Sequence, residues 1–346
     1  MTDRDEMLIR RPRKRTPRPI WRKADIATAM GLAALLLPSW LIPERFWASV
    51  WRAMMRAAVP LNRREIRGNA DNIQAALNEP NRRRAEAIAR DQKAAIYELC
   101  MQDLRGWRPG GWRPRIMLEG EQNLTGALAR GKGAILWVSP FVFNSGPTKI
   151  ALHRCGYRVS HLSSTIHGFS QTRFAAAFLN RVRCAPEDRY LVQRIVFDQA
   201  APSTAMRRMI RVLRAGEIVS IVATSTEGSE MVGGQIFGGR ILVAVGAPRL
   251  AALTGAPLLP VFTVRDPKVG FCVIVEAPIE MEAGRPPKES CVGAIAAYLR
   301  RSEPWIVDFP EQWRMWSKWR AATPFNDPAI LESLGSKSSA LSRQAK

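Results

Sequence analysis

Leu250-Ala251-Ala252-Leu253-Thr254-Gly255-Ala256-Pro257-Leu258-Leu259-Pro260-Val261-Phe262 is the stretch of sequence that indicates the fold of this chain most directly. Its first part completes a short helix predicted over residues 247–254, and its second part begins an apolar strand that extends from Leu258 to Val264. A continuous apolar run of this length is typical of a strand buried on both faces of a sheet. The stretch therefore predicts one helix–strand unit of a layered protein.

Similar apolar runs recur along the chain. The other predicted strands are 134–138, 218–222 and 271–275. The helices predicted between the first two of these strands lie around 148–153, 172–179 and 205–215. Buried strands that alternate with helices favour an α/β fold, with a central, mostly parallel sheet flanked by helices.

Composition sets broader limits. The chain has 346 residues, of which 47% are hydrophobic, so it is too apolar for a disordered protein. Its 52 Lys and Arg against 30 Asp and Glu give a formal charge of +22. Such an excess favours a polyanionic partner, namely nucleic acid, an anionic membrane face or an acidic protein. No recognised DNA- or RNA-binding motif is present, so we expect no specific nucleic-acid partner.

The charge is concentrated near the N-terminus. Residues 1–115 hold 24 basic and 12 acidic residues, although they make up only a third of the chain. The densest part lies within residues 1–23, where prolines between the arginines oppose helix formation. We therefore predict a basic, disordered arm over 1–23.

An uncharged run, Ile26 to Ile42, follows the arm and is slightly shorter than the roughly 20 residues that a spanning helix needs. Next come apolar residues at helical spacing with arginines between them: Phe46, Trp47, Val50, Trp51, Met54 and Met55, with Arg45, Arg52 and Arg56. One interpretation is a buried helical hairpin, and the other is a membrane-associating segment over 24–60. The contiguity of arm, apolar run and Trp/Arg helix favours the membrane interpretation. Residues 69–104 are then predicted as one helix.

Cysteine and histidine usage excludes several kinds of site. Five scattered cysteines without C-x-x-C spacing favour a reducing compartment, with neither a disulfide framework nor a zinc site. No dinucleotide-binding or P-loop glycine motif is present. We therefore expect no metal and no cofactor.

Polar loops follow two of the predicted strands, where an α/β sheet usually carries its chemistry. The loop over 139–146 contains Asn144 and Ser145, and the loop over 223–230 contains Thr224 and Ser225. These four residues are candidate substrate-binding residues. The glycine-rich stretch over 233–240 allows two interpretations. It is either a site where Gly238 and Arg240 approach a ligand or simply a glycine-rich turn.

The order of these segments over about residues 24–320 resembles the bacterial lysophospholipid acyltransferase superfamily. Within that superfamily it is most similar to the late lipid A acyltransferases. The most specific similarities are the Thr254–Pro257 block with its strand and the Pro310–Trp313 block near the end. Further similarities lie at 130–136, 213–219, 236–240 and 273–280.

The resemblance implies a glycerolipid-acyltransferase-like α/β domain over 61–327. The Ser/Lys-rich composition of 328–346 predicts a flexible tail after it. It also implies transfer of a fatty acyl chain from an acyl carrier protein or acyl-CoA to a hydroxyl of a membrane lipid. Such a protein would act at the cytoplasmic face of the inner membrane, as a peripheral protein or with a single N-terminal anchor. An anionic membrane surface and an acidic carrier protein would both suit the positive charge.

The family's catalytic pair is a His followed five positions later by Asp or Glu, and this sequence departs from it. The His position falls on Pro140 and the acid position on Ser145. The family's Arg after the next strand falls about at Ser164, and its Asp after the 218–222 strand falls about at Thr224. Four replacements together favour either a lost reaction or a rebuilt site.

A rebuilt site needs a base, and His167 is the candidate, with Arg173 nearby in the same loop for substrate binding. The alternative, which the residues favour over a catalytic base, is a structural or ligand-binding histidine on a loop. Glu227, or alternatively Glu230, would orient His167 from the neighbouring loop. His153 and His161 fall in a predicted helix and strand, and we interpret them as packing or surface residues. Two hypotheses remain: an acyltransferase with an atypical site, and a non-catalytic lipid- or acyl-carrier-binding protein on the same fold.

Overall fold

The computed structural model describes residues 8–10, 19–164, 167–197, 202–224, 228, 230–281 and 287–321. The helices are α1 (Lys23–Leu41), α2 (Glu44–Ala57), α3 (Val59–Leu77), α4 (Arg82–Arg105), α5 (Glu121–Leu128), α6 (Gly146–Arg154), α7 (Asn180–Asp188), α8 (Pro202–Arg214), α9 (Gly246–Thr254) and α10 (Pro287–Asp308). A π-helical turn, Ala175–Leu179, precedes α7, and two short 3-10 helices, Pro310–Gln312 and Trp316–Lys318, follow α10.

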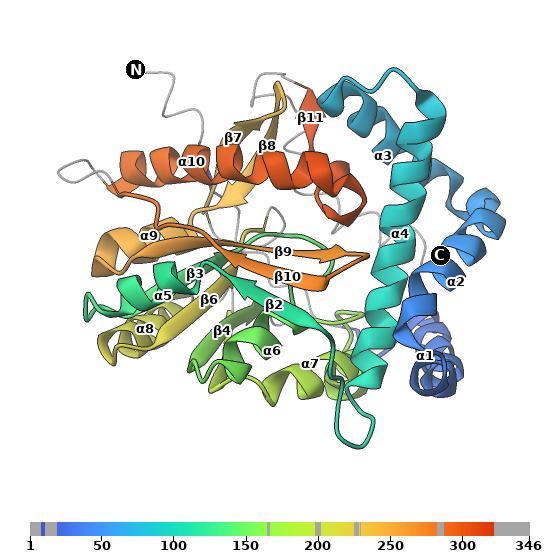
Figure 1. Ribbon diagram of the computed structural model, residues 1–346, viewed down its shortest axis with the longest axis horizontal. Helices are drawn as coiled ribbons and strands as arrows, with labels where there is room; N and C mark the ends of the chain where they lie inside the picture. Colours follow the sequence, from blue (N-terminus) through green and yellow to red (C-terminus); the bar gives the residue numbers. More distant parts are fainter. Residues whose placement is uncertain are drawn as a thin grey trace.

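The strands are β1 (Leu8–Arg10), β2 (Ile116–Glu119), β3 (Ala134–Val138), β4 (Val159–Ser164), β5 (Gln193–Phe197), β6 (Ile218–Val222), β7 (Glu230–Ile236), β8 (Gly239–Ala244), β9 (Leu258–Asp266), β10 (Gly270–Val275) and β11 (Arg320–Ala321). In the described residues the main sheet has seven strands in the order β2-β10-β9-β3-β6-β4-β5. Five neighbouring strands, β9 to β5, are parallel, and only the β10–β9 pairing is antiparallel. The prediction of an α/β fold with a mostly parallel sheet is confirmed (Figure 1).

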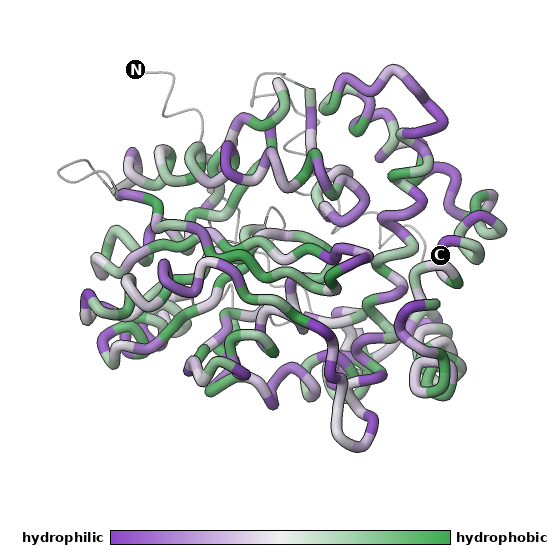
Figure 2. Tube along the Cα trace, viewed as in Figure 1, coloured by the Kyte–Doolittle hydropathy of each residue, from purple (hydrophilic) through white to green (hydrophobic). Residues whose placement is uncertain are grey.

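Helices cover both faces of this sheet, which explains why its central strands are apolar throughout. Ala134, Leu136 and Val138 of β3 pack towards α5 and α6. Ile135 and Trp137 pack on the other face, in the large cluster that includes α8, α9 and α10. All five residues of β3 are buried, and Figure 2 shows hydrophobic residues along the central strands.

The stretch over 250–262 folds as expected, with α9 leading into β9. Gly255 ends α9 in the left-handed conformation, with φ of 66°, which glycine adopts without strain. A Cβ atom there would also lie 2.9 Å from Lys132 Nζ. Gly255 therefore suits both the backbone turn and the close approach of the neighbouring loop.

A second, smaller sheet was not expected from the sequence. It has the order β1-β7-β8-β11, and its β7–β8 hairpin occupies the glycine-rich stretch. Phe237 and Gly238 form the tight turn with positive φ values of 51° and 67°. β1 lies inside the predicted basic arm and pairs with β7, whereas residues 1–7 and 11–18 of that arm lie outside the described residues.

The helical N-terminal region differs from its prediction first in the number of helices. The helix predicted over 69–104 is two helices, because Asn78 adopts a left-handed conformation and ends α3. Asn81 then begins α4 by accepting hydrogen bonds from the backbone N–H groups of Arg83 and Arg84. Asparagine suits both positions, so this local turn signal interrupts the longer apolar periodicity.

α4 is the base on which α1, α2 and α3 pack, at one end of the molecule (Figure 1). Trp47, Trp51 and Met55 of α2 are buried against α4. Of the residues that the membrane interpretation of 24–60 relied on, Trp47 and Trp51 therefore face protein, as the buried-hairpin interpretation expects. Phe46 and Met54 remain about half exposed, at 46% and 48%.

α1 is exposed along most of its length. It is long and apolar enough to cross a membrane, and only 17% of its most apolar window is buried. The exposed apolar side chains include Met30, Leu37 and Leu41. Its buried side is held by Asp25, whose carboxylate accepts a hydrogen bond from Thr172 Oγ1 at 2.8 Å. α1 therefore combines a firm attachment to the domain with an uncovered apolar face.

Candidate functional site

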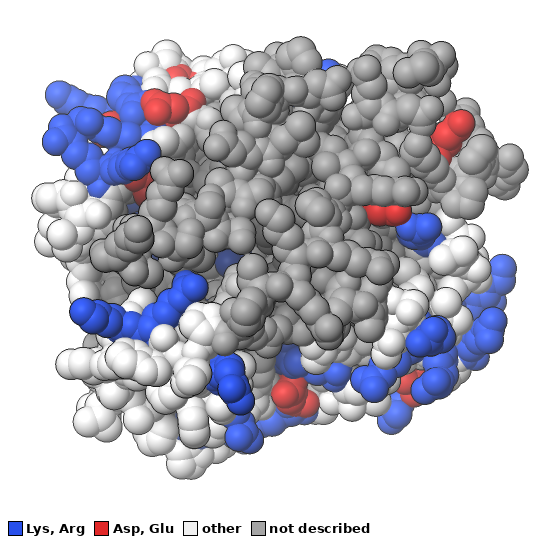
Figure 3. All heavy atoms as spheres, turned by 180° about the vertical axis from the view of Figure 1, so that it is seen from behind, with Lys and Arg blue, Asp and Glu red and all other residues white. Residues whose placement is uncertain are grey.

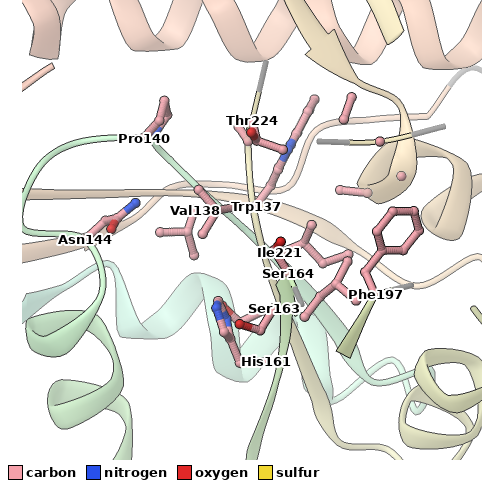
Figure 4. Close-up of a pocket in the computed structure, with 18 of the residues that line it drawn as sticks. Trp137, Val138, Pro140, Asn144, His161, Ser163, Ser164, Phe197, Ile221 and Thr224 are labelled. Carbon is pink, nitrogen blue, oxygen red and sulfur yellow. The ribbon is translucent and has the colours of Figure 1, made fainter. Parts of the chain in front are cut away.

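A cavity of about 730 Å³ lies at the carboxyl ends of β3, β4 and β6, beneath the segment that follows α10. This edge is where a doubly wound sheet ordinarily binds its ligands. Figure 4 shows Pro140 and Asn144 from the loop after β3, His161 and Ser163 from β4, and Thr224 after β6 around one space. The α/β architecture thus places several sequence-distant polar groups around a single cavity.

The four positions that depart from the family pattern meet in this cavity. Pro140, Ser145, Ser164 and Thr224 all line it. They come from three different strand-end loops, and the main sheet brings these together because β3, β6 and β4 are neighbours. The four positions that the sequence predicts to be replaced therefore line one cavity.

A buried carboxylate, Glu187 of α7, organises the polar end of the cavity. Its Oε2 atom accepts from Lys149 Nζ at 2.7 Å and from Arg194 Nη2 at 2.9 Å. Ser145 Oγ, at the start of α6, donates to Oε1, and Lys149 Nζ donates to Ser145 Oγ at 2.9 Å. Only 5% of the Glu187 side chain and 4% of the Lys149 side chain are exposed.

His167 is the fifth member of this group. Its Nε2 atom lies 3.3 Å from Glu187 Oε2 and 3.4 Å from Oε1. The side chain is 25% exposed and lines the cavity. When Nε2 carries the proton, the ring donates to Glu187, and Nδ1 is then the atom that can accept a proton.

The electrostatics of this cluster keep the imidazole neutral and the carboxylate charged. Burial lowers the pKa of His167, and the neighbouring Glu187 only partly opposes the effect. Burial alone would raise the pKa of Glu187, but Lys149, His167 and Arg194 together hold it well below its ordinary value. At neutral pH the pair is therefore a neutral imidazole beside an anionic carboxylate, which is the state that a general base requires.

His161 was interpreted from the sequence as a packing or surface residue, but it also lines the cavity. It lies on β4, is 4% exposed, and its Nδ1 atom is 3.2 Å from Ser220 Oγ on the neighbouring β6. Burial lowers the pKa of His161 well below its usual value. The side chain is neutral and extends the polar wall towards β6.

The other part of the cavity is apolar. Its wall consists of Leu162, Phe197, Met206, Met209, Ile221 and Leu253. Met206 and Met209 come from the inward face of α8, whose outward face carries the exposed Arg207, Arg208, Arg211 and Arg214. A cavity with one polar and one apolar part can hold an amphipathic molecule, with its polar group towards His167.

The remaining sequence candidates fall into three groups. Asn144 lines the cavity and donates from Nδ2 to the Ser139 carbonyl oxygen at 2.7 Å, so it also braces the loop. Arg173, Gly238 and Arg240 are not among the cavity-lining residues: Arg173 is exposed, and the other two lie on the β7–β8 hairpin. Ser225 and Glu227 lie outside the described residues.

Two glycines of the hairpin, Gly234 and Gly239, are explained by packing. A Cβ atom on Gly234 would lie 2.2 Å from Leu299 Cδ1 of α10, and one on Gly239 would lie 2.3 Å from Trp319. These positions need glycine because protein side chains approach the backbone closely. Glu230, the alternative partner for His167, forms an ion pair with Arg249.

Sequence reasoning missed Lys149, Glu187 and Arg194. The one local signal is the spacing of Ser145 and Lys149, which puts both side chains on one face of α6. Glu187 lies 42 residues after Ser145 and has no sequence feature of its own. Within the described parts of the chain, no group of three His, Cys, Asp or Glu side chains could hold a metal ion.

The fold and the cavity define a layered α/β protein with a part-polar, part-apolar cavity at the carboxyl edge of its sheet. Residues 191–320 match the family model of the bacterial lipid A biosynthesis acyltransferases. The predicted resemblance is confirmed by this match, which supports an acyltransferase-like function. The matched range extends from just before β5 to β11 and includes Thr224, whereas Pro140, Ser145 and Ser164 precede it. No curated protein matches the chain.

Proposed function

We propose that this protein transfers a fatty acyl chain from an acyl carrier protein or acyl-CoA to a hydroxyl of a membrane lipid. The observation that carries the proposal is the cavity in which all four replaced positions meet a new His–carboxylate pair, His167 and Glu187. The family match over 191–320 supports the reaction class. The apolar wall would hold the acyl chain, and its thioester would lie near His167.

In this mechanism, Nδ1 of His167 accepts the proton of the lipid hydroxyl as the oxygen attacks the thioester carbonyl carbon. The C–O bond of the new ester forms, and the C–S bond breaks. The proton on His167 then passes to the departing thiolate. Glu187 keeps the imidazole oriented and stabilises the imidazolium that forms between these two proton transfers.

The protein would work at the cytoplasmic face of the inner membrane. The exposed apolar face of α1 supports attachment to lipid, as an anchor or at the interface. Figure 3 shows Lys and Arg side chains gathered along the edges of the face opposite to that of Figure 1. Such basic edges would attract both anionic lipids and an acidic carrier protein.

The test of the catalytic assignment is His167→Gln, assayed for acyl transfer to membrane lipids. Loss of a positioned general base typically lowers a rate by about 100-fold to 10,000-fold. The matched control is His153→Gln, because His153 is exposed on α6 and lies outside the cavity lining. Full transfer by the His167→Gln variant would remove His167 from the mechanism.

The pH profile of the wild type gives an independent measurement. Because burial lowers the pKa of His167, the neutral base persists below pH 6.5, its ordinary value. The acid limb of kcat/KM should therefore fall below pH 6.5, where the ring gains a proton and can no longer accept one. An acid limb at or above pH 6.5 would contradict the assignment.

The second candidate is a non-catalytic protein that binds lipid or acyl carrier protein on the same fold. It is favoured by Pro140, which occupies the family's histidine position in the cavity and has no titratable group. Mass spectrometry of membrane lipids with and without the gene separates the two candidates. A missing acylated lipid supports transfer, whereas unchanged lipids together with binding by the purified protein support the non-catalytic function.

A further inference from the structure

Arg314 is one of the basic residues in the cavity wall. It directly follows the Pro310–Trp313 block, and its backbone N–H donates to the carbonyl oxygen of Pro140 at 3.1 Å. The side chain is accessible and lines the cavity. This bond fixes the backbone of Arg314 beside the loop that contains Pro140, and the side chain extends from there into the cavity wall.

Arg314 differs in its ion pairing from three other basic residues of the cavity wall. Lys149 is paired with Glu187, Arg183 with Asp103 at 2.8 Å, and Arg249 with Glu230. Among the described residues, Arg314 has no ion pair and no side-chain hydrogen bond. Its five N–H donors are therefore available to a ligand in the cavity.

The surroundings of Arg314 make an anion there favourable. Surrounding protein atoms partly desolvate the guanidinium although the side chain is still accessible, and together with the nearby Arg183 they lower the pKa of Arg314 to about 10, while Asp103 partly opposes the effect. The group is still charged at neutral pH. A cation that is both partly desolvated and close to a second cation is stabilised when an anion binds beside it.

We propose that Arg314 forms a phosphate-binding subsite of the cavity. This inference rests on the proposed function, because the substrates of that reaction carry phosphate: the pantetheine arm of the donor, and the headgroup of a phospholipid acceptor. The planar guanidinium matches two phosphate oxygens at once. Phosphate bound there would fix the substrate at the polar end of the cavity that His167 also lines.

Binding measurements on the purified full chain test the subsite and separate the two sources of phosphate. One arm compares 4′-phosphopantetheine with pantetheine, and the other compares dihexanoyl phosphatidic acid with dihexanoylglycerol. The wild type should bind the phosphorylated member of one pair at least about tenfold more tightly. Whichever pair shows this preference identifies the substrate that carries the phosphate.

The variants assign the preference to Arg314. Arg314→Gln should remove the preference for phosphate, and Arg314→Lys should retain part of it, because a lysine keeps the charge but lacks the two-pronged geometry. Arg83→Gln, at an exposed position of α4, is the matched control and should bind like the wild type. The lysine variant keeps the test informative if the glutamine variant fails to fold.

Two results would overturn the subsite: equal binding of both members in each pair by the wild type, or an undiminished phosphate preference in Arg314→Gln. These results are distinct from failure of the proposed function. If no acyl transfer is found but phosphate-dependent binding through Arg314 persists, the reaction is wrong and the subsite stands. If transfer occurs without any phosphate preference, the subsite is wrong and the reaction stands.

Discussion

The cavity and helix α1 depart from ordinary protein architecture in opposite ways. In the cavity, Lys149, Glu187 and Arg194 bring charge into the interior, where it is costly unless paired. On α1, Met30, Leu37 and Leu41 leave apolar surface uncovered. Neither arrangement stabilises an isolated soluble domain, so each marks a surface that meets something else. The polar interior suits the reacting groups of a ligand, and the apolar exterior suits lipid.

The buried cluster and α1 should also differ in how strongly a substitution lowers the stability of the fold. The buried cluster is tightly coupled: removing one partner leaves the others charged and desolvated. The exposed face of α1 has few protein contacts to lose, so changes there should alter membrane attachment while the fold persists. The following predictions test this contrast, beginning with the largest expected effect.

Glu187→Gln should destabilise the fold by about 3–5 kcal/mol, because Lys149 would remain buried without a counter-charge and Arg194 would keep only the half-exposed Asp188 as its partner. Equilibrium unfolding in urea measures the change. Glu217→Gln is the control, since its partner Arg158 is exposed and such pairs contribute about 0–1 kcal/mol. Equal losses in the two variants would show that the cavity cluster is no more coupled than a surface pair.

Met30→Asp should weaken membrane attachment by about 2–3 kcal/mol, because it places a charge in the middle of the exposed face of α1. The measurement is co-sedimentation with lipid vesicles, and the melting temperature should stay unchanged. Val307→Asp, at an exposed position of α10, serves as control. If the Met30→Asp protein remains fully bound, α1 is not the element that contacts lipid.

Arg45→Gln should have the smallest effect, about 1 kcal/mol of binding to vesicles that contain anionic lipid. Arg45 is exposed at the start of α2, beside the end of α1. The loss should disappear with neutral vesicles and at high salt, because it reflects charge attraction alone. An equal loss on neutral vesicles would instead indicate that Arg45 acts through packing on Phe46.

The parts of the fold that could be predicted are those encoded locally. The strands at 134–138 and 218–222 were placed correctly because both faces are covered and the apolar run is unbroken. The second sheet was missed because its glycines resemble a loop, whereas close contacts with Leu299 and Trp319 require them within strands. For α2 the sequence left the partner of the apolar face open between protein and lipid, because its spacing indicates a helix but does not identify the partner.

For the candidate site, the sequence located the strand ends and predicted the replaced motif positions and a base at His167, the histidine of a polar loop. Tertiary structure decided which carboxylate contacts that histidine, and it is Glu187, 20 residues further along the chain. Tertiary structure also brought Arg314 to the same cavity. The physical reason is the distance along the chain over which each effect acts. Hydrophobic periodicity and turn preferences depend on residues close together in the sequence, whereas a buried charge is tolerated only beside partners that folding brings from distant parts of the chain.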